Sequence, residues 1–187
     1  MNLPNKLTLL RLVLTGVFVA SFALSFRGSY TAAFVVFVVA AITDSLDGLI
    51  ARRRNLITDF GKLMDPLADK ILTASAFICL TSFGAIPQWA VILIISREFL
   101  ITGLRSLAAS KGIVLPAEKL GKHKTTWQMI TIIYFLFLLA VLEFSRPAWI
   151  AIAWQAGAYI LVPITVLLSV YSGLAYLYKN RRLIDAA

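Results

Sequence analysis

Acidic side chains gather in one short stretch of an otherwise apolar chain. Four of the nine acidic residues fall within 26 positions and form two pairs with helical spacing, Asp44 with Asp47 and Asp65 with Asp69. Residues three or four apart share one helix face, and two helices joined by a short loop can bring such faces together. Clustered carboxylates repel one another unless a cation lies among them, and oxygen ligands favour Mg²⁺ or Mn²⁺. The stretch therefore predicts a site for one or two divalent cations.

An alternative is that these carboxylates form structural ion pairs. The candidate partners are the nearby basic residues Arg52, Arg53, Arg54, Lys62 and Lys70. Because carboxylates inside a membrane are costly and mostly functional, we favour the cation site. Pro66 directly follows Asp65. It fits either a helix that Asp65 caps or a helix that is kinked at the proline.

The composition indicates a membrane protein. Of 187 residues, 60% are hydrophobic and only 14% are charged, with a mean hydropathy of +0.86. A soluble domain carries about 25% charged residues, so these values exclude an ordinary soluble globule, a disordered chain and a collagen-like chain. The net charge of +9 suits anionic lipid or phosphorylated substrates, and nucleic acid is not an expected partner of so apolar a chain. One cysteine, Cys79, and one histidine, His123, leave no intramolecular disulfide, cysteine-based zinc site or nitrogen-ligand metal site.

Six apolar runs divide the chain. A bilayer span needs about 20 mostly apolar residues, and each run approaches or exceeds that length. The predicted fold is therefore all-α: one membrane-embedded domain, residues 1–187, with six transmembrane helices at 7–26, 30–50, 62–83, 87–109, 125–142 and 149–178. The first run is disfavoured as a cleaved signal peptide, since Arg11 interrupts it and its removal would leave an odd number of spans.

The basic residues predict which way the chain crosses. Six spans place Arg27 and Arg146 on one side of the membrane. The other side receives twelve basic residues: Lys6, Arg52, Arg53, Arg54, Lys62, Lys111, Lys119, Lys122, Lys124, Lys179, Arg181 and Arg182. Because Lys and Arg accumulate in cytoplasmic loops, we expect a multi-pass protein of the cell membrane with both termini in the cytoplasm. The acidic stretch then faces the cytoplasm.

Small residues at fixed positions make the acidic stretch specific. The full pattern reads Asp44-x₂-Asp47-Gly48-x₂-Ala51-Arg52-x₈-Gly61-x₃-Asp65-x₃-Asp69. Glycine and alanine let a ligand approach a helix backbone closely, although they also pack membrane helices. The pattern resembles the signature of the CDP-alcohol phosphotransferases, and every fixed position of that signature is present.

The resemblance implies a six-helix membrane fold, usually dimeric, with an active site that faces the cytoplasm. It implies that the four aspartates hold two divalent cations and that Asp69 is also the general base. It places Gly48, Ala51, Arg52 and Gly61 in the CDP pocket. Asn5, Thr8 and Arg11 look like the family's Asn-x₂-Thr-x₂-Arg element near the nucleotide.

A basic cluster follows on the same predicted side. Arg97 and Arg105 lie eight residues apart on nearly the same helix face, with Arg97 about 12 Å deeper in the membrane. Glu98 points elsewhere on the helix, so we do not expect it to pair with Arg97. Lys119, Lys122 and Lys124 come just before the fifth run. Together these cations predict a second anion site, although the lysines also fit ordinary cytoplasmic charge and the arginines also fit pairing inside the bundle.

The segment Ser96-Arg97-Glu98-x₆-Arg105, with Lys119-x₂-Lys122-x-Lys124-Thr125-Thr126-x-Gln128-Met129, resembles the family members whose acceptor is glycerol 3-phosphate. That resemblance implies phosphatidyl transfer from CDP-diacylglycerol to the acceptor's 1-hydroxyl, with release of CMP. Three alternatives stay open: a family member that uses another acceptor such as inositol phosphate, an aspartate-rich prenyltransferase, and a divalent-cation transporter. The single compact acidic cluster at one end of the spans disfavours the last two.

Overall fold

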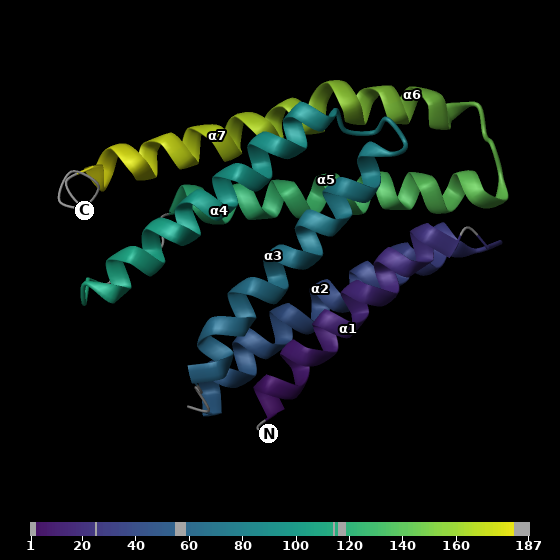
Figure 1. Ribbon diagram of the computed structural model, residues 1–187. Coiled ribbons are helices and arrows are strands. Elements are labelled where there is room, and N and C mark those ends of the chain that lie inside the picture. The colour runs from purple at the N-terminus through teal and green to yellow at the C-terminus, as the bar shows by residue number, and fades with distance from the viewer. Residues whose placement is uncertain (1–2, 25, 55–58, 114, 116–118, 182–187) are drawn as a thin grey trace.

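The computed structural model describes residues 3–24, 26–54, 59–113, 115 and 119–181, and over these residues the chain is helical without a strand (Figure 1). The elements in order are α1 (Leu3–Leu24), α2 (Ser29–Arg54), α3 (Asp59–Thr81), α4 (Gln88–Ser110), α5 (Lys119–Phe144), α6 (Trp149–Ala156), the π-helical turn η1 (Gly157–Leu161) and α7 (Val162–Lys179). The all-α prediction is confirmed, and each apolar run coincides with one helix or, for the last run, with α6, η1 and α7 in succession.

The helices vary in how well they suit a bilayer. Two described stretches are long and apolar enough to cross one, Gly121–Phe144 and Trp149–Lys179, and two shorter apolar stretches occupy Thr8–Leu24 and Ser29–Thr43. Helix α4 carries Arg97, Glu98 and Arg105, which lower its hydropathy. The number of crossings and the side of the termini stay predictions.

Helix α3 shows where Pro66 fits. The helix begins at Asp59 and runs through Thr81, so Asp65 ends its second turn and Pro66 begins its third. The arrangement in which Asp65 caps the helix is therefore wrong, and Pro66 lies inside α3; a kink at the proline stays a prediction.

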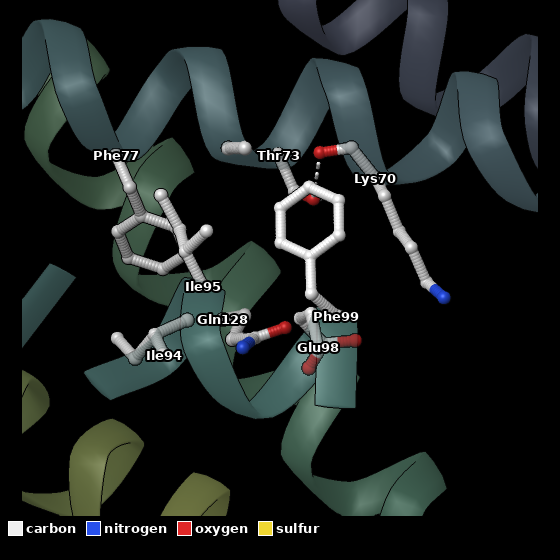
Figure 2. A pocket seen from close by; sticks show the side chains of 9 residues that line it. Lys70, Thr73, Phe77, Ile94, Ile95, Glu98, Phe99 and Gln128 are labelled. Carbon is white, nitrogen blue, oxygen red and sulfur yellow. Dashed lines mark hydrogen bonds between the residues drawn. The ribbon is translucent and has the colours of Figure 1, made fainter. Parts of the chain in front are cut away.

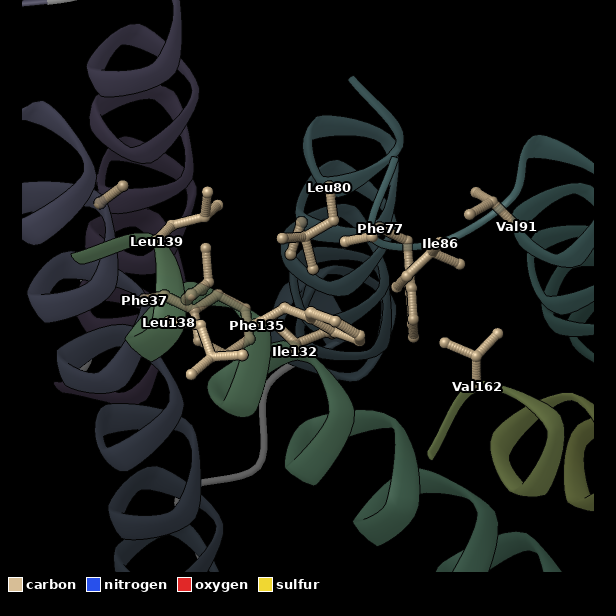
Figure 3. Close-up of a cluster of buried hydrophobic side chains, with 14 of the residues drawn as sticks. Phe37, Phe77, Leu80, Ile86, Val91, Ile132, Phe135, Leu138, Leu139 and Val162 are labelled. Carbon is tan, nitrogen blue, oxygen red and sulfur yellow. The ribbon is translucent and has the colours of Figure 1, made fainter. Parts of the chain in front are cut away.

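Apolar side chains from every layer of the bundle form one core (Figure 3). Helix α1 packs against α2 and α3, while α5 packs against α2, α3 and α7. Fully buried aromatic rings sit at the centre: Phe18, Phe37, Phe77 and Phe135. A smaller cluster of Ile101, Leu104 and Tyr176 joins α4 to α7. This second cluster matters for function because it fixes α7 beside the charged residues of α4.

Two contacts set the orientation of the outer elements. The Glu143 carboxylate near the end of α5 accepts the backbone N–H groups of Gly28, at 2.8 Å, and of Thr31, at 3.0 Å, so it caps the start of α2. Gly28 has a φ of +93°, which glycine adopts without strain. The end of α5 therefore lies against the turn between α1 and α2.

The π-helical turn before α7 coincides with a proline. Pro163 has no N–H group, and its ring crowds the carbonyl four residues earlier, so it disturbs the regular hydrogen bonding of an α-helix at this point. A wider turn at Gly157–Leu161 accommodates the proline and keeps the chain helical. Gly157 packs against Tyr134, whose hydroxyl donates to the Ala153 carbonyl at 2.7 Å. These contacts hold α6 and η1 against α5.

Candidate active site

The backbone places the acidic pairs as the sequence predicts. Asp44 and Asp47 belong to the second half of α2, and Asp65 and Asp69 belong to the first half of α3. Most of the predicted site side chains lie outside the described residues: Asn5, Asp44, Asp47, Gly48, Ala51, Arg52, Gly61, Asp65 and Lys119. Among the side chains that the structure does describe, no group of three or more Asp, Glu, His or Cys gathers. The cation site therefore stays a prediction.

Asp69 borders a large cavity between α2, α3 and α5. The cavity has a volume of about 510 Å³, and Asp69 lines it with Thr125 and Thr126. The rest of its wall is apolar and comes from all three helices: Val38, Ala41, Ile42, Leu72, Met129, Ile130 and Ile133. A half-buried carboxylate beside an apolar wall suits an amphipathic ligand, with one polar end and one apolar end.

The N-terminal element lies close to this region. Thr8 and Arg11 are each only 1% exposed, on the helix α1 that packs against both α2 and α3. Buried polar side chains on a membrane helix face the bundle rather than lipid. Thr8 and Arg11 thus face the interior of the bundle, and the nearness of this element to the nucleotide stays a prediction.

A carboxylate organises the basic cluster. Glu98 Oε1 lies 3.2 Å from Arg97 Nη1, and the same oxygen pairs with Lys124 Nζ from α5. Arg97 also donates from Nη2 to the Ser172 hydroxyl of α7 at 3.1 Å. The expectation that Glu98 does not partner Arg97 is therefore wrong. Adjacent residues diverge on a helix, but the long arginine side chain curls back to reach its neighbour's carboxylate.

Arg105 and the lysines differ in their surroundings. Arg105 Nε donates to the Tyr176 hydroxyl of α7 at 3.2 Å, and its guanidinium lies 5.6 Å from the centroid of the Tyr176 ring. Lys124 is 3% exposed, whereas Lys122 points to solvent. The structure thus brings Arg97 and Lys124 together around Glu98. Arg105 lies about two helical turns further along α4. Lys122 lies outside this cluster.

Lys70 and Glu98 were not predicted as site residues from the sequence. Lys70 of α3 donates to the Thr102 hydroxyl of α4 and lines a small pocket with Glu98 and Gln128 (Figure 2). Lys70 and Lys124 are both close enough to Asp69 and Glu98 to interact electrostatically with each. The sequence did contain a signal for them, because Lys70 and Glu98 are charged residues inside apolar runs. Charged residues in membrane spans are costly and are usually functional. The basic cluster therefore adjoins the Asp69 carboxylate.

The described residues define a bundle of largely apolar helices in which Arg97, Glu98 and Lys124 form a charged cluster. The family model for CDP-alcohol phosphatidyltransferases matches residues 1–172, which include the whole acidic signature. The chain belongs to the CDP-alcohol phosphatidyltransferase family.

Several curated proteins are similar over nearly the whole chain. The CDP-diacylglycerol–glycerol-3-phosphate 3-phosphatidyltransferase of Bacillus subtilis is 39% identical, over 96% of this chain and 95% of that protein. A probable phosphatidylglycerophosphate synthase of Mycobacterium tuberculosis H37Rv is 38% identical, over 97% of this chain and 82% of that protein. A Rickettsia bellii protein with the same name as the Bacillus one is 34% identical, over 94% of this chain and 93% of that protein.

Proposed function

We propose that this chain transfers the phosphatidyl group of CDP-diacylglycerol to the 1-hydroxyl of glycerol 3-phosphate, giving phosphatidylglycerol phosphate and CMP for phospholipid biosynthesis. The names of relatives at 34–39% identity over almost the full chain support this enzyme activity. The structural observation that carries the proposal is the position of Asp69, between an apolar cavity and a cluster of cations. A lipid donor needs the first environment, and a phosphorylated acceptor needs the second.

The cavity suits the donor. CDP-diacylglycerol reaches the site sideways from the bilayer, with acyl carbons against the apolar wall contributed by α2 and α5. Its nucleotide end extends toward the signature residues. By the family pattern, the CDP contacts come from Asn5, Thr8, Gly48, Ala51, Arg52 and Gly61.

Carboxylates alone make up the proposed cation site. Asp44, Asp47, Asp65 and Asp69 offer only hard oxygen ligands, which fit two Mg²⁺ or Mn²⁺ ions. When bound, the ions neutralise the diphosphate and stabilise the leaving oxygen. Chelation with EDTA should abolish activity, and added Mg²⁺ or Mn²⁺ should restore it.

The chain's own residues supply the acceptor chemistry. Arg97, Arg105, Lys119, Lys122 and Lys124 bind the acceptor phosphate and so orient its free hydroxyl, a proximity effect. Asp69 takes the proton from that hydroxyl. The oxygen attacks the phosphorus that carries diacylglycerol, a new P–O bond forms, and the bond to CMP breaks.

The proposal includes a location and an assembly. The chain is a single membrane-embedded domain of six spans in the cell membrane, with both termini and the site at the cytoplasmic face. Two copies form a homodimer, as is usual in the family. A divalent-cation transporter is not favoured, since the relatives are named as transferases.

An assay of acceptor choice tests the function. Purified full-length protein with CDP-diacylglycerol and Mg²⁺ receives glycerol 3-phosphate, serine or inositol phosphate in separate reactions. We expect CMP release only with glycerol 3-phosphate. Equal or faster CMP release with inositol phosphate would contradict the proposed acceptor.

A further inference from the structure

We infer that Glu98 is a positioning residue for the acceptor: it gathers Arg97, Lys124 and Lys70 into one cluster whose excess charge matches a phosphate monoester. The inference rests on the proposed function, in which Arg97 and Lys124 help to bind the acceptor phosphate, and it adds Lys70 to them. Glu98 itself does not contact substrate in this arrangement, and it acts through the cations around it.

The geometry joins all three cations to Glu98, Arg97 and Lys124 through its carboxylate and Lys70 through Thr102 and the Glu98 backbone carbonyl. Its Oε1 lies 3.2 Å from Arg97 Nη1 and also pairs with Lys124 Nζ. Its backbone carbonyl accepts the Thr102 hydroxyl at 2.7 Å, and that hydroxyl accepts Lys70 Nζ. Cations from α3, α4 and α5 are thus tied to one turn of α4. Figure 2 shows Lys70 and Glu98 on facing helices of the same small pocket.

Burial makes the carboxylate necessary. The exposed fractions of the side chains are 4% for Lys124, 13% for Arg97 and 18% for Glu98. Cations packed this closely away from water repel one another strongly unless an anion lies among them. Without Glu98, Lys124 and Arg97 have no reason to stay together, and the preformed phosphate site opens.

The charges also explain why the cluster is selective. Three cations and one carboxylate leave two positive charges in excess, and a phosphate monoester carries about two negative charges at pH 7. A phosphate that docks here neutralises the cluster, whereas an uncharged alcohol does not. Lys70 and Lys124 also interact with Asp69. A phosphate held by them therefore places the rest of the acceptor beside the proposed base.

A second contact fixes the arginine of the cluster. Arg97 Nη2 donates to Ser172 at 3.1 Å, so one end of its guanidinium is held by α7 and the other by Glu98. The planar fork is then aligned before the acceptor arrives, which lowers the cost of ordering it on binding.

The test compares two carboxylates in the full-length enzyme. Glu98→Gln should raise the KM for glycerol 3-phosphate about tenfold, because a lost charge-assisted contact typically weakens binding by that factor. The KM for CDP-diacylglycerol and kcat should change less than about twofold, as expected for binding lost equally from ground and transition states. Glu143→Gln is the matched control: it alters a carboxylate with several hydrogen bonds at the other end of α5 and should leave both KM values unchanged.

A double variant tests whether Glu98 acts through Lys124. If it does, Glu98→Gln combined with Lys124→Gln should raise the acceptor KM hardly more than Lys124→Gln alone. Effects that multiply in full would overturn the inference, and so would an unchanged acceptor KM in Glu98→Gln. Should Glu98→Gln not fold, Glu98→Asp keeps the charge but shortens the reach to Lys124; a several-fold rise in acceptor KM is expected, and none would overturn the inference.

The experiments distinguish a failure of the proposed function from a failure of the role assigned to Glu98. If the wild-type protein releases no CMP with glycerol 3-phosphate, the activity itself is wrong. If the wild type is active and Glu98→Gln behaves like it, only the role of Glu98 is wrong.

Discussion

Asp69 stands where two environments meet, an apolar cavity on one side and Lys70 and Lys124 on the other. An acceptor phosphate bound by these cations would bring the acceptor hydroxyl, and with it the proton to be removed, close to the Asp69 carboxylate. Asp69→Asn keeps the shape of the side chain but removes its basicity. CMP release should fall by about 10²–10⁴-fold while the protein still inserts into membranes. Near-normal turnover would remove the base assignment.

Arg105 tests the other half of the acceptor site. Its guanidinium is held over the Tyr176 ring and bonded to the Tyr176 hydroxyl, so it is oriented before substrate binds. Arg105→Ala should raise the acceptor KM about tenfold with a small effect on kcat. Tyr176→Phe keeps the ring and loses only the hydroxyl, so its effect on the same KM should be smaller. Steady-state kinetics with varied glycerol 3-phosphate measure both, and an unchanged KM in Arg105→Ala would contradict the role.

At the level of single residues, the sequence shows which residue types occur and how they are spaced, but it does not show which side chains contact one another. The helical placement of the four aspartates followed from spacing alone and is confirmed by α2 and α3. The Arg97–Glu98 pair was not predictable, because it depends on the conformation of a long side chain. The contact of Lys70 with Thr102 was missed because it depends on how α3 packs against α4, which no local pattern encodes.

Helix α7 acts on the site through its small residues. A Cβ atom added at Gly173 would lie 2.7 Å from Arg97 Cγ, in the stem of the side chain rather than at its flexible end. Gly173→Ala should therefore displace Arg97 and raise the acceptor KM by roughly tenfold, since overpacking typically costs ~1–3 kcal/mol. Gly103→Ala on α4 is the control, because nothing lies within 4 Å of its added Cβ. Equal kinetics in the two variants would show that α7 does not position Arg97.

Glu143 stabilises the opposite end of the bundle. Its carboxylate accepts the N–H groups of Gly28, Tyr30 and Thr31 and the Thr31 hydroxyl, so it acts as the cap of α2. Glu143→Ala should lower the free energy of unfolding by about 1–2 kcal/mol, as loss of a helix cap does. A thermal-unfolding assay in detergent should show a lower midpoint, with unchanged KM values at low temperature. An unchanged midpoint would mean that packing alone holds this corner.

The six helices were predictable because each apolar run is long and turn residues separate the runs. What the sequence left open was decided by packing between elements. Pro66 fitted a cap or an interior position, and α3 begins early enough to enclose it. The last run was predicted as one continuous helix, and its π-helical turn at Gly157–Leu161 was missed. The close approach of Gly157 to Tyr134 on α5 is a packing feature that the run itself does not encode.

For the whole molecule, the distribution of basic residues and the contacts between helices indicate the same two ends of the bundle. Glu143 ties the end of α5 to the turn after α1, so Arg27 and Arg146 belong to the same end of the bundle. Lys124 lies near the start of α5, away from the turn that precedes α6, and Asp69 lies in the first half of α3, away from the turn that precedes α4. The two basic residues assigned to the outer side by charge counting thus lie at the same end of the bundle in the structure.

That agreement makes the orientation testable. In a cysteine-free background, Cys79→Ala, single cysteines replace Arg27, Arg146 or Ser110, the last at the end of α4 on the predicted cytoplasmic side. A membrane-impermeant maleimide applied to intact spheroplasts should label the Arg27→Cys and Arg146→Cys variants at once. It should label Ser110→Cys only after the membrane is opened, because Lys and Arg favour the cytoplasmic side. The reverse pattern would put the acidic segment outside the cell, away from any supply of a cytidine nucleotide donor, and would contradict the proposed function together with the orientation.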